Sequence, residues 1–157
     1  MTRGAQAAAK AAQHYAQSGA GAGATLIAAS DAWSDQAGGT SGIIWGILLK
    51  EIGKIFGNEQ QPDVRAVEKA IREATSAVTS FGKAKLGDKT LADVLIPFSE
   101  KLSELVNTKN TQVSISEVWK EASLTADDAA QATAELLPKI GRARPHAEKS
   151  LGHQDPG

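Results

Sequence analysis

The feature that most constrains the fold is the helical spacing of the apolar residues. Over about residues 62–85, apolar side chains recur every three or four positions, which places them on one face of a helix. This stripe consists of Val64, Val67, Ile71, Ala74, Val78 and Phe81. A second stripe consists of Leu91, Val94, Leu95, Phe98, Leu102 and Leu105. Because no stretch alternates with a period of two, the sequence predicts an all-α, up-and-down helical bundle.

Breaks between the apolar segments divide the chain into six expected helices. We expect them at about residues 1–18, 24–36, 43–56, 62–85, 91–105 and 114–140, followed by a long loop over 141–157. Pro97 lies inside the fifth, and because the apolar period continues past it, we expect a kink rather than an end. The sixth is expected to soften at 124–127, where Thr125 could cap a new start. Trp33, Trp45 and Trp119 are expected in the core.

Composition limits the classes of partner. The chain of 157 residues is expected to form a single domain, and its net charge of −1 offers no field for nucleic acid or anionic lipid. It has no cysteine, which excludes disulfides and thiolate sites. The apolar run at 43–49 is far shorter than a membrane span. We therefore expect a cytoplasmic protein without nucleic-acid or membrane partners.

The turn at residues 38–42, Gly-Gly-Thr-Ser-Gly, stands directly before the most apolar segment. Thr40 or Ser41 is suited to cap the helix that follows, and a helix start also favours an anion. The lysine and the spacing of a Walker loop are missing. A simple helix–helix turn and a phosphate-binding turn both remain open at this point.

Alternate turns of an up-and-down bundle lie at the same end, so the 38–42 turn, the 87–90 turn and the tail (residues 141–157) should lie together. They carry hydroxyls, acids and cations that suit a polyphosphate. These residues are Thr40, Ser41, Asp88, Lys89, Thr90, Arg142, Arg144, Lys149 and Asp155. Asp88 and Thr90 could instead cap the fifth helix, and Asp93 could be a surface acid. No catalytic residue and no metal ligand is assigned, and the three histidines lack a third partner at metal spacing.

Three separated motifs resemble those of the nucleotide-binding L subunit of dihydroxyacetone (glycerone) kinase. They are Gly-Gly-Thr-Ser-Gly at 38–42, Gly-Lys-Ala-Lys-Leu-Gly-Asp-Lys-Thr-Leu with Asp93 at 82–93, and Gly-Arg-Ala to Gly-His-Gln-Asp-Pro-Gly at 141–157. The resemblance extends over the whole chain and keeps the family's order. It is closer to the triose kinase branch than to the related lipid and fatty-acid kinases.

The resemblance implies a barrel of eight antiparallel helices that holds ADP or ATP at one end. The L subunit of that family presents the nucleotide to a substrate-binding K subunit, and some members use a phosphotransferase-system donor. By resemblance, Thr40 and Ser41 would bind phosphates, Gly82 and Leu91 would line the adenine pocket, and Arg142 would contact the nucleotide. The last three residues would close over it: Asp155, Pro156 and Gly157.

Two departures from the family pattern accompany the resemblance. The aspartate cluster that holds Mg²⁺ on the phosphates is absent from the sequence, and so are the first and last of the eight helices. We therefore expect a domain truncated at both ends, weak nucleotide binding and no kinase activity in the isolated chain. An open barrel side would favour self-association. The alternative is a non-catalytic remnant or a regulatory module.

Overall fold

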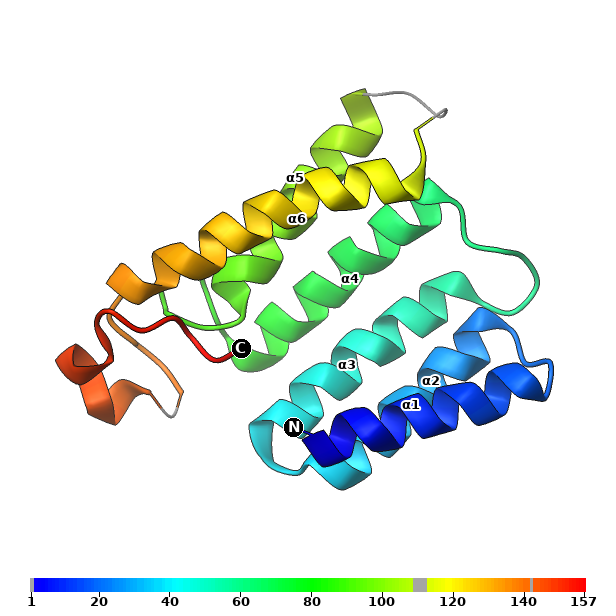
Figure 1. Ribbon diagram of the computed structural model, residues 1–157, viewed down its shortest axis with the longest axis horizontal. Coiled ribbons are helices and arrows are strands. Elements are labelled where there is room, and N and C mark those ends of the chain that lie inside the picture. Colours follow the sequence, from blue (N-terminus) through cyan, green and yellow to red (C-terminus); the bar gives the residue numbers. More distant parts are fainter. Residues whose placement is uncertain (1, 109–112, 142) are drawn as a thin grey trace. The chain divides into compact units, whose positions relative to one another are not determined.

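The structure, a computed structural model, describes residues 2–108, 113–141 and 143–157. In this part of the chain it contains helices and no strand, so the all-α prediction is confirmed (Figure 1). The α-helices are α1 (Thr2–Gln17), α2 (Ala22–Ala37), α3 (Gly39–Phe56), α4 (Val64–Gly82), α5 (Ala92–Thr108) and α6 (Ile115–Ala132). Two 3-10 segments follow, η1 (Thr133–Glu135) and η2 (Arg144–Ser150). No described helix has the length and apolar character needed to cross a membrane.

The chain divides into two compact units, Met1–Val78 and Thr79–Gly157, and the boundary falls inside α4. In the first unit α1 packs against α2, and α2 packs against α3 (Figure 1). Small residues allow this close approach: a Cβ added at Gly4 would lie 2.7 Å from the Cβ of Ala37. The buried Ser30 hydroxyl donates a 2.7 Å hydrogen bond to the carbonyl oxygen of Gly46 and so joins α2 to α3.

The start of α2 and the end of α3 touch through their backbones. A Cβ added at Gly23 would lie 2.7 Å from the carbonyl oxygens of Gly53 and Gly57. The Gly23 amide donates to the Gly57 oxygen at 2.7 Å, and the Ala24 amide donates to Asn58 Oδ1 at 2.8 Å. A Cβ added at Gly21 would likewise lie 2.5 Å from the Cα of Asn58. The absence of side chains at Gly21 and Gly23 therefore allows the two helix ends to meet.

Helix α4 follows the predicted stripe closely. Val67, Ala70, Ala74 and Val78 are buried, and Asp63 Oδ1 accepts the Ala66 amide at 2.7 Å to cap the helix start. The far end differs from the prediction, because the helix ends at Gly82 and the side chain of Phe81 is 53% exposed.

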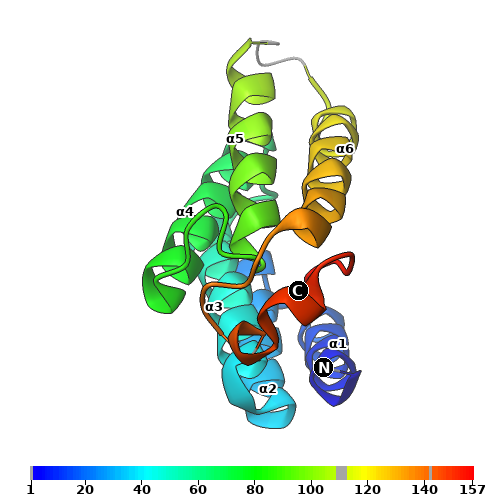
Figure 2. The ribbon, with the colours of Figure 1, turned by 90° about the vertical axis from the view of Figure 1, so that its left-hand side faces the viewer.

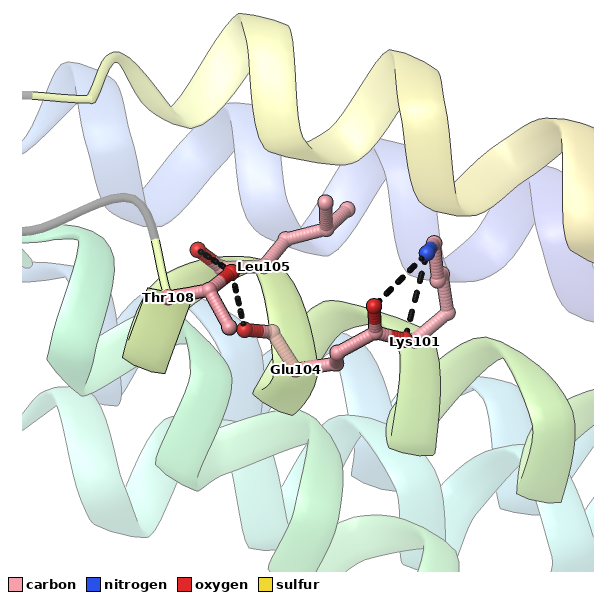
Figure 3. Close-up of polar contacts among 4 residues, drawn as sticks. All are labelled: Lys101, Glu104, Leu105 and Thr108. Atoms are coloured by element: carbon pink, nitrogen blue, oxygen red, sulfur yellow. Dashed lines mark hydrogen bonds and ion pairs between the residues drawn. The ribbon is translucent and has the colours of Figure 1, made fainter.

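In the second unit α5 packs against α6, and the two run side by side in Figure 2. Leu102 and Leu105 of α5 and Val118 and Ala122 of α6 are buried. Helix α5 continues through Pro97, as its apolar period predicted. Its outer face carries local polar contacts, with Lys101 3.1 Å from Glu104 and the Thr108 hydroxyl 2.8 Å from the Glu104 carbonyl oxygen (Figure 3). Exposed pairs of this kind contribute little stability.

Several predicted boundaries in this unit were wrong. Helix α6 ends at Ala132 instead of residue 140 and runs without a break past Thr125. Pro138 keeps the helix from reaching residue 140, because a residue that precedes proline is disfavoured in the α conformation. The tail is not a plain loop, since it contains η2.

The tryptophans were also predicted too deep. Trp119 is 42% exposed and packs edge-on against Phe98, with ring centroids 5.0 Å apart. Trp33 and Trp45 are half-buried and lie against each other with centroids 5.8 Å apart.

Candidate functional site

The 38–42 turn lies in the first unit and is open. Gly38 occupies the N-cap position with φ 62° and ψ 166°, and the first helical hydrogen bond runs from the Gly42 amide to the Gly38 oxygen at 3.2 Å. Thr40 and Ser41 were predicted as N-caps, but both lie inside the first turn of α3, after the cap. Gly38 occupies the N-cap position instead, because only glycine readily adopts a backbone conformation with φ 62° and ψ 166°.

The exposed Thr40 is thus placed beside the first amides of an 18-residue helix whose first turn carries no acidic residue. Gly38 has no side chain that could cap these amides. A helix start of this kind can accept an anion, because the backbone N–H groups and the helix dipole both favour negative charge.

The 87–90 turn lies in the second unit and is closed by carboxylates. Asp93 accepts the amides of Gly87 and Thr90, the latter at 2.7 Å, and the Thr90 hydroxyl accepts the Ala92 amide at 3.2 Å. Thr90 and Asp93 thus both satisfy amides at the start of α5, with the sequence spacing Thr-x-x-Asp. The capping interpretation of Thr90 is therefore confirmed. Of the alternatives left open for Asp93, a surface acid is excluded, because Asp93 is 6% exposed.

Asp88 also serves the turn. Its Oδ2 accepts the Lys85 amide at 2.8 Å, and its carbonyl oxygen accepts the Lys139 amide at 3.2 Å. Asp88 therefore stabilises the turn before α5 rather than the helix start itself.

Lys89 is the unexpected residue of this turn. It has a left-handed backbone with φ 58°, and only 3% of it is exposed. Its Nζ donates a 2.7 Å hydrogen bond to the carbonyl oxygen of Ser150 in the tail. No local sequence signal could reveal this burial, because the partner lies 61 residues away.

The tail returns to the end of α6 and to the 87–90 turn. The Asp155 amide donates to the buried Thr133 hydroxyl at 2.9 Å, and the Gly152 amide donates to the Ala134 oxygen at 3.0 Å. A Cβ added at Gly157 would lie 3.3 Å from the Cβ of Leu91. Leu91, Asp155 and Gly157, which were predicted as site residues, thus lie together in the second unit, with Pro156 between the last two in the chain.

The environment of Asp155 disfavours its negative charge. Burial raises the pKa of its carboxyl above the ordinary 3.8, and the nearby charge of Asp93 acts in the same direction. The Gly157 amide, 2.9 Å from Asp155 Oδ1, and the Lys89 ammonium act in the opposite direction and offset part of the rise.

The remaining predicted residues are placed less closely. Gly82 is exposed at the end of α4, and only Ala84 lies within 4 Å of a Cβ built on it. Thr40 and Ser41 belong to the first unit, and Arg142 lies outside the described residues. Among the described residues, no cluster of three His, Asp or Glu side chains could hold a metal ion. A surface hollow of about 640 Å³ is lined by residues of α6 and its approach, none of them a predicted site residue: Val113, Glu117, Lys120, Glu121 and Leu124.

Comparison with known proteins adds the family. The family model described as the DAK2 domain matches residues 1–157. The L-erythrulose kinase of Pectobacterium atrosepticum is 54% identical over 157 residues, which are 100% of this chain and 26% of that protein. The D-erythrulose kinase of Mycolicibacterium smegmatis is 43% identical over the same 100% of the chain and 27% of its own length. The chain thus spans about a quarter of the length of these two relatives.

A third relative covers a larger share of its own length. The ADP-binding subunit DhaL of the PEP-dependent dihydroxyacetone kinase of Escherichia coli is 33% identical over 120 residues, which are 76% of this chain and 56% of that subunit. These matches confirm the resemblance that the three motifs predicted. With its whole length matched by the family model, this chain belongs to the DAK2 domain family of dihydroxyacetone and erythrulose kinases.

Proposed function

We propose that this chain is the nucleotide-binding domain of a ketose kinase, which binds ADP or ATP and presents the phosphoryl group to a substrate held elsewhere. The observation that carries the proposal is the DAK2 match over residues 1–157, joined to a relative that is named for binding ADP. The ketose is proposed to be of the dihydroxyacetone or erythrulose class, from the names of the relatives.

The phosphates are proposed to bind at the start of α3. Thr40 and Ser41 stand in its first turn, where backbone amides and the exposed Thr40 side chain can contact phosphate oxygens. The glycine cap supports this role, because no side chain caps these amides and the first turn carries no acidic residue.

The base is proposed to bind at the second unit. Leu91 offers an apolar side chain next to Gly157, and the chain segment of Asp155, Pro156 and Gly157 would close over the nucleotide. Gly82 and Arg142 complete the proposed set on the strength of the motifs alone.

The described residues fit positioning better than proton transfer or metal binding. Phosphoryl transfer depends on placement and on neutralising charge, and a family Mg²⁺ would supply part of that neutralisation. The two buried carboxylates of the second turn do not fit a magnesium site, because their oxygens accept the amides of Lys85, Gly87 and Thr90. We therefore derive no step through a metal from these residues.

Substrate chemistry is accordingly assigned to a partner. We propose a ketose-binding K-type domain or subunit as that partner, with ATP or a phosphotransferase-system protein as the donor. The chain alone is proposed to be inactive as a kinase. A non-catalytic remnant or regulatory module is the second candidate.

Calorimetric titration of the chain with ADP and ATP, with and without Mg²⁺, tests the proposal. We expect saturable binding with a dissociation constant above about 10 μM, since hydroxyl, amide and cation contacts alone leave much phosphate charge unneutralised. GTP serves as the comparison for base selectivity. Failure of ADP and ATP to bind at millimolar concentrations would refute a nucleotide-binding role, and low-micromolar binding that requires Mg²⁺ would refute the expected weakness.

A further inference from the structure

The buried Lys89 links two parts of the second unit that are far apart in sequence. Its ammonium group donates to the carbonyl oxygen of Ser150 at 2.7 Å, and 3% of the residue is exposed. A buried lysine is costly unless its charge is well compensated, and here the partners are a backbone carbonyl and the nearby Asp155 charge. The left-handed backbone at Lys89, with φ 58°, adds a further cost. Because the fold tolerates both costs at Lys89, we expect the contact of its ammonium group with Ser150 to matter for the structure or the function of this unit.

The segment that Lys89 holds is the one next to Leu91. Ser150 closes η2, and after it come the Gly152 amide on the Ala134 oxygen and the Asp155 amide on the Thr133 hydroxyl. These two anchors join the tail to the end of α6. The Lys89 bond instead joins the tail to the 87–90 turn, directly before α5 and beside Leu91.

We propose that Lys89 is a positioning residue of the nucleotide site. Its ammonium fixes the Ser150 carbonyl and thereby sets the approach of residues 151–157, which brings Asp155 and Gly157 to Leu91. Lys89 does this without contact to the nucleotide itself. The inference rests on the proposed function, because the tail segment matters only if it closes over a bound base.

Replacing the ammonium while keeping the length of the side chain tests this role. In Lys89→Met, the amides of Gly152 and Asp155 should exchange hydrogen at least about tenfold faster, while the amides of α5 and α6 keep their protection. The dissociation constant for ADP should rise about fivefold to tenfold, because part of the binding free energy is then used to order the tail. Lys120→Met, at an exposed lysine of α6 in the same unit, is the control and should change neither quantity.

Conservative variants separate positioning from general stability. Lys89→Arg retains a cationic donor and should restore part of the tail protection and of the ADP affinity, whereas Lys89→Gln should restore less. If Lys89→Met does not fold, the comparison of Lys89→Arg with Lys89→Gln carries the test, and equal tail exchange and equal ADP affinity in these two variants overturn the inference.

Other outcomes distinguish this inference from the proposed function. Exchange that accelerates equally across α5, α6 and the tail overturns the inference, because Lys89 would then hold the whole unit. A tail that loosens without any change in ADP affinity overturns it as well. If the wild-type chain binds no ADP, the proposed function is refuted. If the wild-type chain binds ADP and Lys89→Met binds it with the same affinity, only the role of Lys89 is refuted.

Discussion

Two glycine-containing turns of this chain share a composition and are completed in different ways. The 38–42 turn and the 87–90 turn each combine glycine with hydroxyl residues and lead into a helix. At the first, glycine is the cap and Thr40 is exposed. At the second, Asp88 and Asp93 are buried and accept the amides of the turn.

The difference shows how one motif class can serve two purposes. Carboxylates that occupy the amides of a turn make it rigid and leave no room for an anionic ligand. A helix start without a side-chain cap gives up that stability and keeps its amides available. The 87–90 turn is therefore a support, and the 38–42 turn keeps the amides that the proposed function assigns to phosphate.

The largest effect is expected when the support loses its carboxylate. Asp93→Ala leaves the partly buried amides of Gly87 and Thr90 without their acceptor and should lower the free energy of unfolding by about 2–4 kcal/mol. Urea unfolding followed by circular dichroism measures it. Asp93→Asn keeps one acceptor oxygen and should lose less. A loss below about 0.5 kcal/mol in Asp93→Ala would contradict the supporting role.

A smaller loss is expected at the glycine cap of the open turn. Gly38→Ala forces alanine into φ 62° and ψ 166° and should lower the free energy of unfolding by about 1–3 kcal/mol, although nothing lies within 4 Å of the added Cβ. Gly82→Ala is the control, because Gly82 ends a helix and its φ is not positive. Equal unfolding midpoints for Gly38→Ala and Gly82→Ala would show that backbone strain at Gly38 does not determine the loss of stability.

The open turn should affect binding more than stability. Thr40→Ala removes an exposed hydroxyl and should change the free energy of unfolding by less than about 0.5 kcal/mol. In the proposed function the same change should weaken ADP binding about tenfold, through loss of a hydrogen bond to a charged phosphate. Calorimetry measures the ADP affinity of this variant and of the control Ser116→Ala, which removes an exposed hydroxyl of α6. Equal ADP affinities of the two variants would refute a phosphate contact of Thr40.

The smallest expected effect is the pH dependence from Asp155. Its folded pKa lies above the ordinary 3.8, so between these two values the folded chain binds more protons than the unfolded chain. The stability contribution of Asp155 is therefore present below 3.8 and is lost as the pH rises through the folded pKa. Asp155→Asn should remove this slope, and NMR titration of the carboxyl should give a pKa above 3.8. A pKa at or below that value would show that the Lys89 and Gly157 contacts outweigh burial.

Helix stripes made much of the fold predictable. The spacing of Val67, Ala74 and Val78 in α4 reflects burial on one face, which is a local property of the sequence. The sequence also indicated Thr90 as a possible cap of α5, but it left Asp93 open as a surface acid.

The rest depended on contacts between distant residues. Lys89 is buried where the tail returns to it, and the hydroxyl of Thr133, which is 1% exposed, accepts the Asp155 amide of the same tail. No pattern within either segment encodes such a meeting. The motifs of the resemblance did indicate that Leu91 and the last residues of the chain belong to one site, and the structure does bring Leu91 and Gly157 together.

The backbone contact between the start of α2 and the end of α3 limits how this domain can be engineered. Exchanging helical glycine for alanine is a common way to make a protein more heat-resistant, because alanine has the higher helix propensity. At Gly23 and Gly53 the new methyl group would meet carbonyl oxygens at 2.7 and 2.9 Å, and backbone cannot rotate aside as a side chain can. A thermostabilising library should therefore keep both positions fixed.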